Sequence, residues 1–325
     1  MLITGRPGTG KSHLVRTLIE LLRSKNEFVT ILAKTHLAAH NVNGVTINHF
    51  ANKTIRRGKC PQGWIVVDEI SMVDVACWAQ LTKLAFCEVK WILVGDFDQY
   101  LPINDRWCGQ PLTKGFEGSS LLHTMVQGNR CHLTHNFRSD PSLFDFCGSL
   151  CPDGFRSNMP ITEMVAAARQ HFPATTRKAD YNLCISHAKR RRLNFESNLR
   201  RGLFLKAPPS KQANAPQNMF LQIGLKVMCI CEGKRGRLCN HAFFTVSALS
   251  PNTVTLEDDI GTFEIKHEEA SKLLRLTYAL TYASVEGMTL PGVLRLHDVS
   301  HARMCWRKLN VGLSRGTAFN LVECQ

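Results

Sequence analysis

Residues 5–12 read GRPGTGKS, a complete G-x-x-x-x-G-K-[ST] phosphate loop that directly follows the apolar pair Leu2-Ile3. In such a loop the backbone N–H groups close around a polyphosphate, the lysine reaches the β- and γ-phosphates, and the final hydroxyl holds Mg²⁺. The loop needs a buried strand before it and a helix after it, and the amphipathic residues 14–22 supply that helix. This order predicts an α/β fold that binds a nucleoside triphosphate through Gly5, Gly8, Thr9, Gly10, Lys11, Ser12 and His13.

The composition indicates a globular protein with a polyanionic partner. The 325 residues are 44% hydrophobic and 20% charged, and lysine plus arginine outnumber the acidic residues 40 to 26. The resulting formal charge of +14 favours nucleic acid. Taken alone, the basic run at residues 189–192 fits an exposed helix turn or a localisation signal as well as it fits a nucleic-acid contact.

The chain shows no sign of export or membrane insertion. It has no apolar stretch long enough to span a bilayer and no secretory leader, so we expect an intracellular protein of the nucleus or cytoplasm without a membrane partner. The 13 cysteines are odd in number and scattered. We therefore expect mostly reduced thiols and no local disulfide.

Short apolar runs alternate with helical stretches over residues 1–130, and this pattern predicts a first α/β domain with a parallel sheet. Its expected strands, after Leu2-Ile3, are residues 30–33, 64–67 and 90–94. A second α/β domain is expected from residue 131 to 204, with a strand at 181–185 and a basic helix at 188–199.

The composition changes over residues 205–270, where alternating runs at 243–249 and 253–256 predict a small β insertion. Strand-like runs at 276–281 and 293–296 follow, and residues 309–313 lead into a polar turn. Residues 271–325 are therefore expected to complete the second α/β domain.

Two carboxylates, Asp68 and Glu69, follow the apolar run at residues 64–67. An acidic pair at the end of a buried strand is costly unless a cation or another partner satisfies it. Next to a phosphate loop, Asp68 is suited to hold Mg²⁺ together with Ser12, and Glu69 to polarise the attacking water. The alternative is a buried or paired carboxylate dyad with a structural role.

Gln99 follows the next strand and is suited to sense a γ-phosphate, whereas Asp96 and Asp98 are candidates for capping the turn. Arg138 and Arg315 both fall in the expected second domain. Arginines supplied across a domain cleft neutralise charge that develops on the transferred phosphoryl group. Taken separately, each arginine is better explained by a surface ion pair.

Seven segments, in their order along the chain, resemble the motifs of superfamily-one helicases, and most of all the petite-integration-frequency (Pif) helicases and their RecD relatives. The segments are ILAKTHLAA at residues 31–39, TINHF at 46–50, VVDEISM at 66–72, LVGDFDQYLP at 93–102, LTHNFRS at 133–139, YALTYASVEGMTL at 278–290 and NVGLSR at 310–315. The resemblance spans nearly the whole chain. Within the family, the sequence is similar to the divergent forms found in large DNA viruses and mobile elements.

The resemblance implies two RecA-like P-loop NTPase domains with parallel sheets, and a small SH3-like β insertion in the second. It implies ATP with Mg²⁺ between the domains and an ATP-dependent DNA helicase that moves 5′ to 3′ on single-stranded DNA and acts at DNA junctions. The positions that match the family's ATPase residues are Lys11, Ser12, Asp68, Glu69, Gln99, Arg138 and Arg315, with Phe137 beside adenine and Gly287 near the phosphates. The positions in strand-contacting segments are Thr35, Asn48, His49, Thr281 and Thr289. A monomer is favoured, and a viral factory is a further expected location.

Three departures from the family pattern stand out. Residues 283–286 read ASVE where the family usually has His-Lys-Ser-Gln, and Asn48 stands where the family has histidine. The third is the start of the chain close to the phosphate loop, without the upstream glutamine segment that recognises adenine. The expectation is either a fragment or relaxed selection of the nucleotide base.

Two other functions stay open at this point: an RNA helicase of the viral superfamily-one kind, and a catalytically weak, nucleotide-gated nucleic-acid-binding module. A zinc site from Cys229, Cys231, Cys239 and His241 is disfavoured, because alternate residues of a strand point to opposite faces.

Overall fold

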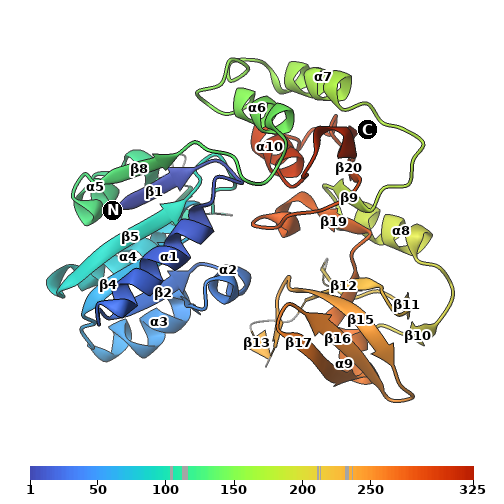
Figure 1. Ribbon diagram of the computed structural model, residues 1–325, viewed down its shortest axis with the longest axis horizontal. Coiled ribbons are helices and arrows are strands. Elements are labelled where there is room, and N and C mark those ends of the chain that lie inside the picture. The colour runs from blue at the N-terminus through green and yellow to red at the C-terminus, as the bar shows by residue number, and fades with distance from the viewer. Residues whose placement is uncertain (103–104, 112–115, 211, 213, 231–233, 236) are drawn as a thin grey trace. The chain divides into compact units, whose positions relative to one another are not determined.

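Two parallel sheets organise the chain, one in each of two units, Met1–Asn158 and Met159–Gln325. We describe each unit separately from a computed structural model, which covers residues 1–102, 105–111, 116–210, 212, 214–230, 234–235 and 237–325. Figure 1 labels most of their helices and strands.

The sheet of the first unit has six strands in the order β3-β2-β4-β5-β1-β8, and every neighbouring pair is parallel. In chain order the strands are β1 (Leu2–Gly5), β2 (Val29–Ala33), β3 (Val45–Thr46), β4 (Gly63–Asp68), β5 (Val89–Gly95) and β8 (Arg130–Leu133). The predicted strands at residues 30–33, 64–67 and 90–94 are therefore confirmed, as is the strand before the phosphate loop.

Helices cover both faces of this sheet, which explains why its strands are continuously apolar rather than alternating. The helices are α1 (Lys11–Ser24), α2 (His36–Asn41), α3 (Ile47–Lys53), α4 (Val75–Leu81), α5 (Ser120–Val126) and α6 (Pro141–Ser149). Val15 and Ile19 of α1 pack in one core with Ile3 and Val94, while Trp78 of α4 belongs to the core on the other side. Figure 1 shows α1 lying along one face of the strands.

The boundary expected after residue 130 lies elsewhere in the structure, because β8 pairs with β1 along its whole length, from Leu2↔Arg130 to Gly5↔Leu133. The first unit therefore continues to Asn158 and includes α6. The α6 carbonyl of Phe144 accepts a hydrogen bond from Arg6 Nη1 at 2.9 Å, and the Arg6 guanidinium lies 3.6 Å from the centroid of the Phe144 ring. These contacts fasten the phosphate loop to the segment assigned above to the second domain.

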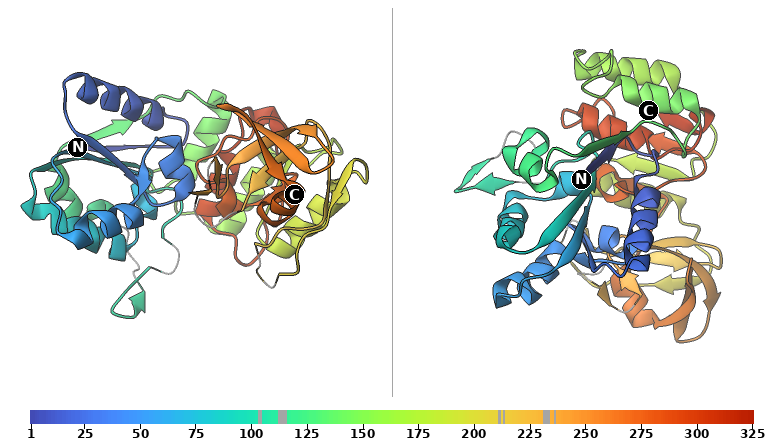
Figure 2. Two further views of the ribbon diagram at one scale, coloured as in Figure 1. Left: turned by 90° about the horizontal axis from the view of Figure 1, so that it is seen from below. Right: turned by 60° about the vertical axis from the view of Figure 1, so that its left-hand side comes forward.

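A two-stranded ribbon, β6 (Arg106–Trp107) and β7 (Gln110–Pro111), follows the end of β5. It projects away from the six-stranded sheet (Figure 2). Short 3₁₀ turns complete the unit: η1 (Ile55–Arg57), η2 (Ile70–Met72), η3 (Thr82–Phe86) and η4 (Phe116–Gly118).

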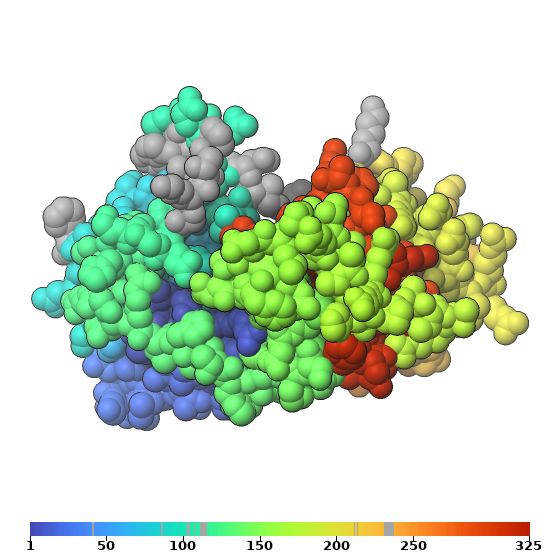
Figure 3. All heavy atoms as spheres, turned by 90° about the horizontal axis from the view of Figure 1, so that it is seen from above, coloured from blue at the N-terminus to red at the C-terminus, as the bar shows by residue number. Residues whose placement is uncertain are grey.

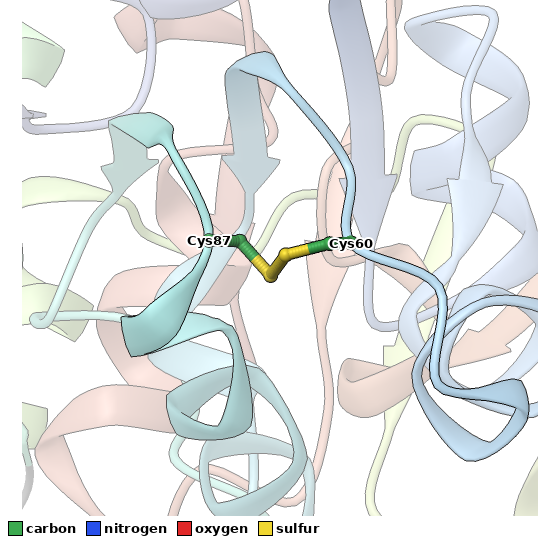
Figure 4. Close-up of a disulfide and its surroundings, with 2 residues drawn as sticks. All are labelled: Cys60 and Cys87. Carbon is green, nitrogen blue, oxygen red and sulfur yellow. A yellow bond between two sulfur atoms is a disulfide. The ribbon is translucent and has the colours of Figure 1, made fainter.

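The expectation of no local disulfide is wrong, since Cys60 and Cys87 are bonded with their Cα atoms 5.5 Å apart (Figure 4). The reason is topological. Cys60 precedes β4 and Cys87 precedes β5, and these strands are parallel neighbours that begin side by side. Ten other cysteines among the described residues are free thiols.

The second unit contains a four-stranded parallel sheet in the order β19-β9-β20-β21. The strands are β9 (Tyr181–Cys184), β19 (Ala279–Thr281), β20 (Leu294–Leu296) and β21 (Val322–Cys324), with helices α7 (Ile161–His171), α8 (His187–Ser197) and α10 (Trp306–Leu313) and turns η5 (Tyr282–Val285) and η6 (Phe319–Leu321). Strands from both sides of the β-rich segment thus share one sheet. No helix within the described parts of either unit has the length and apolarity to cross a membrane.

The β-rich segment forms a five-stranded antiparallel sheet in the order β17-β16-β15-β12-β18. Its strands are β12 (Lys226–Cys229), β15 (Phe243–Leu249), β16 (Thr253–Asp258), β17 (Gly261–Lys266) and β18 (Leu274–Leu276). The segment also contains the helix α9 (His267–Leu273) and two separate strand pairs, β10 (Leu203–Leu205) with β11 (Met219–Leu221) and β13 (Lys234–Arg235) with β14 (Leu238–Cys239). We call residues 203–276 the β module.

The β module extends past the expected end at residue 270, because β18 pairs with β12. The single strand expected at residues 276–281 is in fact divided between two sheets. Leu276 ends β18 of the β module, and Ala279 begins β19 of the parallel sheet.

Candidate functional site

The predicted site residues of the first unit all follow the carboxyl ends of its six parallel strands. The phosphate loop follows β1, the Asp68-Glu69 pair ends β4, and Gln99 follows β5. In parallel α/β sheets, ligands bind outside this edge. The topology therefore gathers residues from distant parts of the sequence at one place.

The phosphate loop is shaped by glycines with left-handed backbone. Gly8 has φ +87° and Gly10 has φ +81°, and Gly10 immediately precedes α1. A β-carbon on Gly8 would lie 2.8 Å from Cβ of Arg138, and one on Gly10 would lie 3.3 Å from the Phe137 ring. Side chains at positions 8 and 10 would therefore crowd the loop in front of the N-terminus of α1, where a phosphate would bind.

Lys11 is folded back over the loop, where Nζ donates to the carbonyls of Gly5 at 2.6 Å and Arg6 at 3.1 Å. Burial lowers the pKa of the Lys11 ammonium, the carboxylates of Asp96, Glu69 and Asp68 oppose that shift, and Arg138 adds to it. These four side chains therefore lie within electrostatic range of Lys11. Thr9 is buried and donates to the Arg6 carbonyl, whereas Ser12 and His13 are exposed at the start of α1.

Asp68 ends β4 and is 7% exposed. Burial, reinforced by the adjacent charge of Glu69, raises the pKa of Asp68 to about 7. Glu69 adopts a left-handed backbone with φ 51°, and its N–H donates to Asp68 Oδ1 at 2.9 Å. A positive charge in front of this pair, such as a metal ion with nucleotide, would favour its ionised form.

Asp96 has a larger part in the site than the sequence analysis gave it. Its carboxylate accepts from the backbone N–H of Asp98 at 3.0 Å, which is the expected turn cap, and from Gln99 Nε2 at 2.9 Å. Asp96 and Gln99 are each 3% exposed. Asp96 therefore orients the proposed γ-phosphate sensor, and its position after a buried strand was the available signal.

Arg138 lies in the first unit beside Gly8, so the expectation that the second domain carries it is wrong. The turn that holds it is built on Asn136, whose Oδ1 accepts from the N–H groups of Arg138 at 3.1 Å and Ser139 at 3.3 Å. Phe137 N–H donates to the Gly8 carbonyl at 2.8 Å, and its side chain is 73% exposed. Sequence reasoning missed Asn136, whose side chain fixes the backbone of Arg138 and Ser139.

Thr35, Asn48 and His49 follow the ends of β2 and β3. The Thr35 hydroxyl caps α2 by accepting from Ala38 N–H at 3.1 Å, whereas Asn48 and His49 are exposed on α3. Next to them Lys34 forms an ion pair with Asp74, the N-cap residue of α4. Asn48 and His49 are therefore accessible to a strand, and Thr35 has a structural role as well.

In the second unit, Arg315 is 1% exposed and follows α10. Its guanidinium donates to the carbonyls of Val311 at 3.1 Å and Met288 at 3.3 Å, which ties α10 to the segment after Gly287. Gly287 has φ 77°, a backbone that favours glycine.

Thr281 is buried and forms a capping box with Ser284 at the start of η5. Ser284 belongs to the ASVE segment that departs from the family pattern. The capping box gives its hydroxyl a local structural role. Thr289, by contrast, is exposed and lines a cavity of about 530 Å³ within the second unit, together with Tyr181, Lys226 and Phe243.

The disfavoured zinc site includes Cys231, which lies outside the described residues. Within the described parts of the chain, no group of three or more His, Cys, Asp and Glu side chains could hold a metal ion. Burial lowers the pKa of His241 to about 4.

The loop, the parallel sheet and the residues at its edge define a P-loop nucleotide-binding protein of the α/β class. Residues 1–105 match a family described as "AAA domain". In sequence the chain is similar to the ATP-dependent DNA helicase PIF7 of Trypanosoma brucei brucei, 32% identical over 172 residues, and to the ATP-dependent DNA helicase PIF1 of Emericella nidulans, 30% identical over 182 residues. These alignments cover 44% and 45% of this chain but only 17% and 24% of the relatives, so the chain matches a minor part of each.

The fold resembles Pif1 helicases over the whole chain. The crystal structure of Pif1 helicase from Candida albicans covers 100% of this chain and 90% of its own length with a TM-score of 0.68 at 19% identity. Bacteroides Pif1 bound to single-stranded DNA covers 100% of this chain and 88% of its own with a TM-score of 0.64 at 17% identity. The similarity to Pif1 helicases therefore covers less than half of the chain in sequence and all of it in fold.

Proposed function

We propose that this chain is the motor of a Pif1-like ATP-dependent DNA helicase that moves 5′ to 3′ on single-stranded DNA. The observation that carries the proposal is that Lys11, Asp68, Glu69 and Arg138 lie together at one sheet edge. The charges of Asp68, Glu69 and Arg138 all shift the pKa of Lys11. The curated relatives named above are ATP-dependent DNA helicases, and one similar structure holds single-stranded DNA.

Hydrolysis follows from the roles that the geometry allows. Lys11 and the N–H groups of the loop hold the phosphates, and Glu69 accepts a proton from the attacking water. Gln99, oriented by Asp96, orients that water or senses the γ-phosphate. Arg138 stabilises charge on the transferred group from within the first unit, and Arg315 is proposed as the arginine of the second.

Ser12 and Asp68 fit Mg²⁺, because both offer hard oxygen ligands and because the pKa of buried Asp68, raised to about 7, indicates a carboxylate short of positive charge. When bound, Mg²⁺ would neutralise charge on the β- and γ-phosphates. We propose that the Phe137 ring stacks on adenine, and its exposure supports this role.

Strand contacts are proposed for Thr35, Asn48 and His49 in the first unit and for Thr281 and Thr289 in the second. Exposure favours Asn48, His49 and Thr289. We further propose that the β module corresponds to the family's SH3-like insertion, that the protein acts at DNA junctions in the nucleus or cytoplasm, and that the ASVE segment marks a viral or mobile-element form.

ATPase assays with single-stranded DNA, single-stranded RNA or no polymer test the proposal, followed by unwinding of duplexes with 5′ or 3′ tails. We expect stimulation by DNA and unwinding from 5′ tails. Stimulation by RNA alone would favour an RNA helicase. ATP-dependent DNA binding without hydrolysis would favour the nucleotide-gated binding module.

A further inference from the structure

Two arginines of the second unit, Arg190 on α8 and Arg275 on β18, are completely buried, each with 0% exposure. They rank with Trp78 among the largest fully buried side chains of the described chain. Arginine is almost never fully buried unless it is paired. Neither residue belongs to the nucleotide site or to the proposed strand contacts.

The guanidinium of Arg190 makes no hydrogen bond through Nε, Nη1 or Nη2 to any described residue. Arg275 is partly satisfied: Nη1 donates to Asn214 Oδ1 and Nη2 lies 3.8 Å from the Met228 sulfur, while its Nε lacks a partner in the described chain. Nδ1 of His187, in the first turn of α8, is likewise buried without a described partner.

The carboxylates of this region are engaged elsewhere. Asp298 pairs with Lys189 at 2.6 Å, and Glu196 pairs with Arg192 at 3.6 Å. Within the described residues no ion pair includes Arg190 or Arg275. Other buried charges of this unit are compensated, since Glu323, at 0% exposure, is paired with both Arg177 and Arg295.

The charge of Arg190 also acts on Arg275. Burial lowers the pKa of Arg190 to about 10, and burial together with the charge of Arg190 lowers the pKa of Arg275 to about 9. Burial and both arginines lower the pKa of His187 as well. The arginines remain charged at neutral pH, and they share one region, since Asn194 of α8 exchanges hydrogen bonds with Ala279 just after β18.

An uncompensated buried charge costs several kcal/mol, and an anion held between guanidinium groups offsets that cost. Guanidinium presents its N–H groups as a fork that matches the spacing of phosphate oxygens. We propose that Arg190 and Arg275 form a binding site for a phosphate-class oxyanion, assisted by His187 and Asn214. The phosphate is either free in solution or part of a nucleic-acid backbone.

The test is equilibrium dialysis with radiolabelled inorganic phosphate and thermal unfolding of the full chain at constant ionic strength. Both are done in a Lys11→Ala background, so that the phosphate loop contributes nothing and failure of the helicase proposal has no bearing on the result. We compare this protein with additional Arg190→Met, Arg275→Met or Arg192→Met substitutions. Arg192→Met is the matched control, because Arg192 is exposed on the same helix.

We expect one phosphate per chain in the Lys11→Ala protein and in its Arg192→Met form, and a rise in Tm of about 5 °C or more at a hundredfold excess over Kd, relative to chloride. Arg190→Met and Arg275→Met should lose both effects. Competition by a single-stranded oligonucleotide would assign the site to backbone phosphate, and its absence would assign it to the free ion.

Absence of phosphate binding in the Lys11→Ala protein would overturn the proposal. This test does not depend on the folding of the arginine variants. Unchanged binding after Arg190→Met would overturn it too. So would an Arg190→Met protein that is more stable than its parent at every phosphate concentration, because the buried arginine would then be merely destabilising.

Discussion

At the residue scale, the phosphate loop depends on glycines for two separate reasons, backbone conformation and space. Gly8 has φ +87° and lies where a β-carbon would meet Arg138, whereas Gly58 has φ +65° with nothing within 4 Å of such a carbon. A substitution at Gly58 therefore measures backbone strain alone, and the same substitution at Gly8 adds the collision.

We predict that Gly8→Ala weakens ATP binding more than about tenfold, since a 1.4 kcal/mol loss already has that effect and the Arg138 turn must shift. Gly58→Ala should cost about 1 kcal/mol of unfolding free energy and leave ATP affinity unchanged. Fluorescent-nucleotide titration and urea unfolding measure the two quantities. Equal ATP affinities for both variants would show that the contact with Arg138 is irrelevant to the site.

The Asp68 carboxyl gives a pH-dependent prediction in the absence of Mg²⁺ and nucleotide. Its folded pKa of about 7 exceeds the ordinary 3.8, so the folded state prefers the protonated form. The stability gained from that preference is complete below pH 3.8 and is lost as the pH rises through about 7.

Asp68→Asn, which mimics the protonated carboxyl, should therefore be more stable than wild type at pH 8, by on the order of 1–3 kcal/mol. The difference should shrink steadily toward pH 4.5. Urea unfolding at pH 8, 6 and 4.5 measures it. A wild type that is the more stable protein at pH 8 would contradict the assigned burial of the charge.

At the scale of elements, local patterns in the sequence predicted which residues form strands, but not which strands are neighbours. The runs at residues 30–33, 64–67 and 90–94 were found because parallel strands buried on both faces are continuously apolar. The short β8 carries no such run: its Arg130 and His132 are exposed, and only pairing with β1 places it in the first unit.

The same limit explains the errors in the site. Arg138 was expected in the wrong unit because its position depends on β8, and Asp96 was undervalued because its partner Gln99 is identified only by geometry. The phosphate loop and the Asp68-Glu69 pair were predictable because their chemistry lies within a few consecutive residues.

The disulfide between Cys60 and Cys87 links the starts of two neighbouring strands and closes a loop with a sequence separation of 27. We predict that Cys60→Ser lowers the unfolding free energy of the first unit by about 3 kcal/mol, because the unfolded chain regains the entropy of that loop. Denaturant unfolding with and without reductant measures this. Wild type should lose the same stability on reduction, whereas Cys77→Ser, at a buried free thiol, should not remove the response to reductant.

At the scale of the whole molecule, the proposed ATP site lies in the first unit at the ends of parallel strands, and a charge of +14 favours nucleic acid as the partner. The fold resembles Pif1 helicases over 100% of the chain, while the sequence match reaches 44% and 45% of it. The late ASVE segment departs from the family pattern, yet Ser284 gives it a capping box of its own. We therefore predict that coupling between DNA binding and hydrolysis is retained.

The most direct measurement is steady-state ATP hydrolysis with and without single-stranded DNA, for wild type, Glu69→Gln and Lys11→Ala. We predict that DNA stimulates ATP hydrolysis by the wild type. Glu69→Gln should lose about 10²–10⁴-fold of this turnover and retain ATP binding, whereas Lys11→Ala should lose both ATP binding and turnover. Turnover in wild type that ignores DNA, or normal stimulated turnover in either variant, would contradict this prediction.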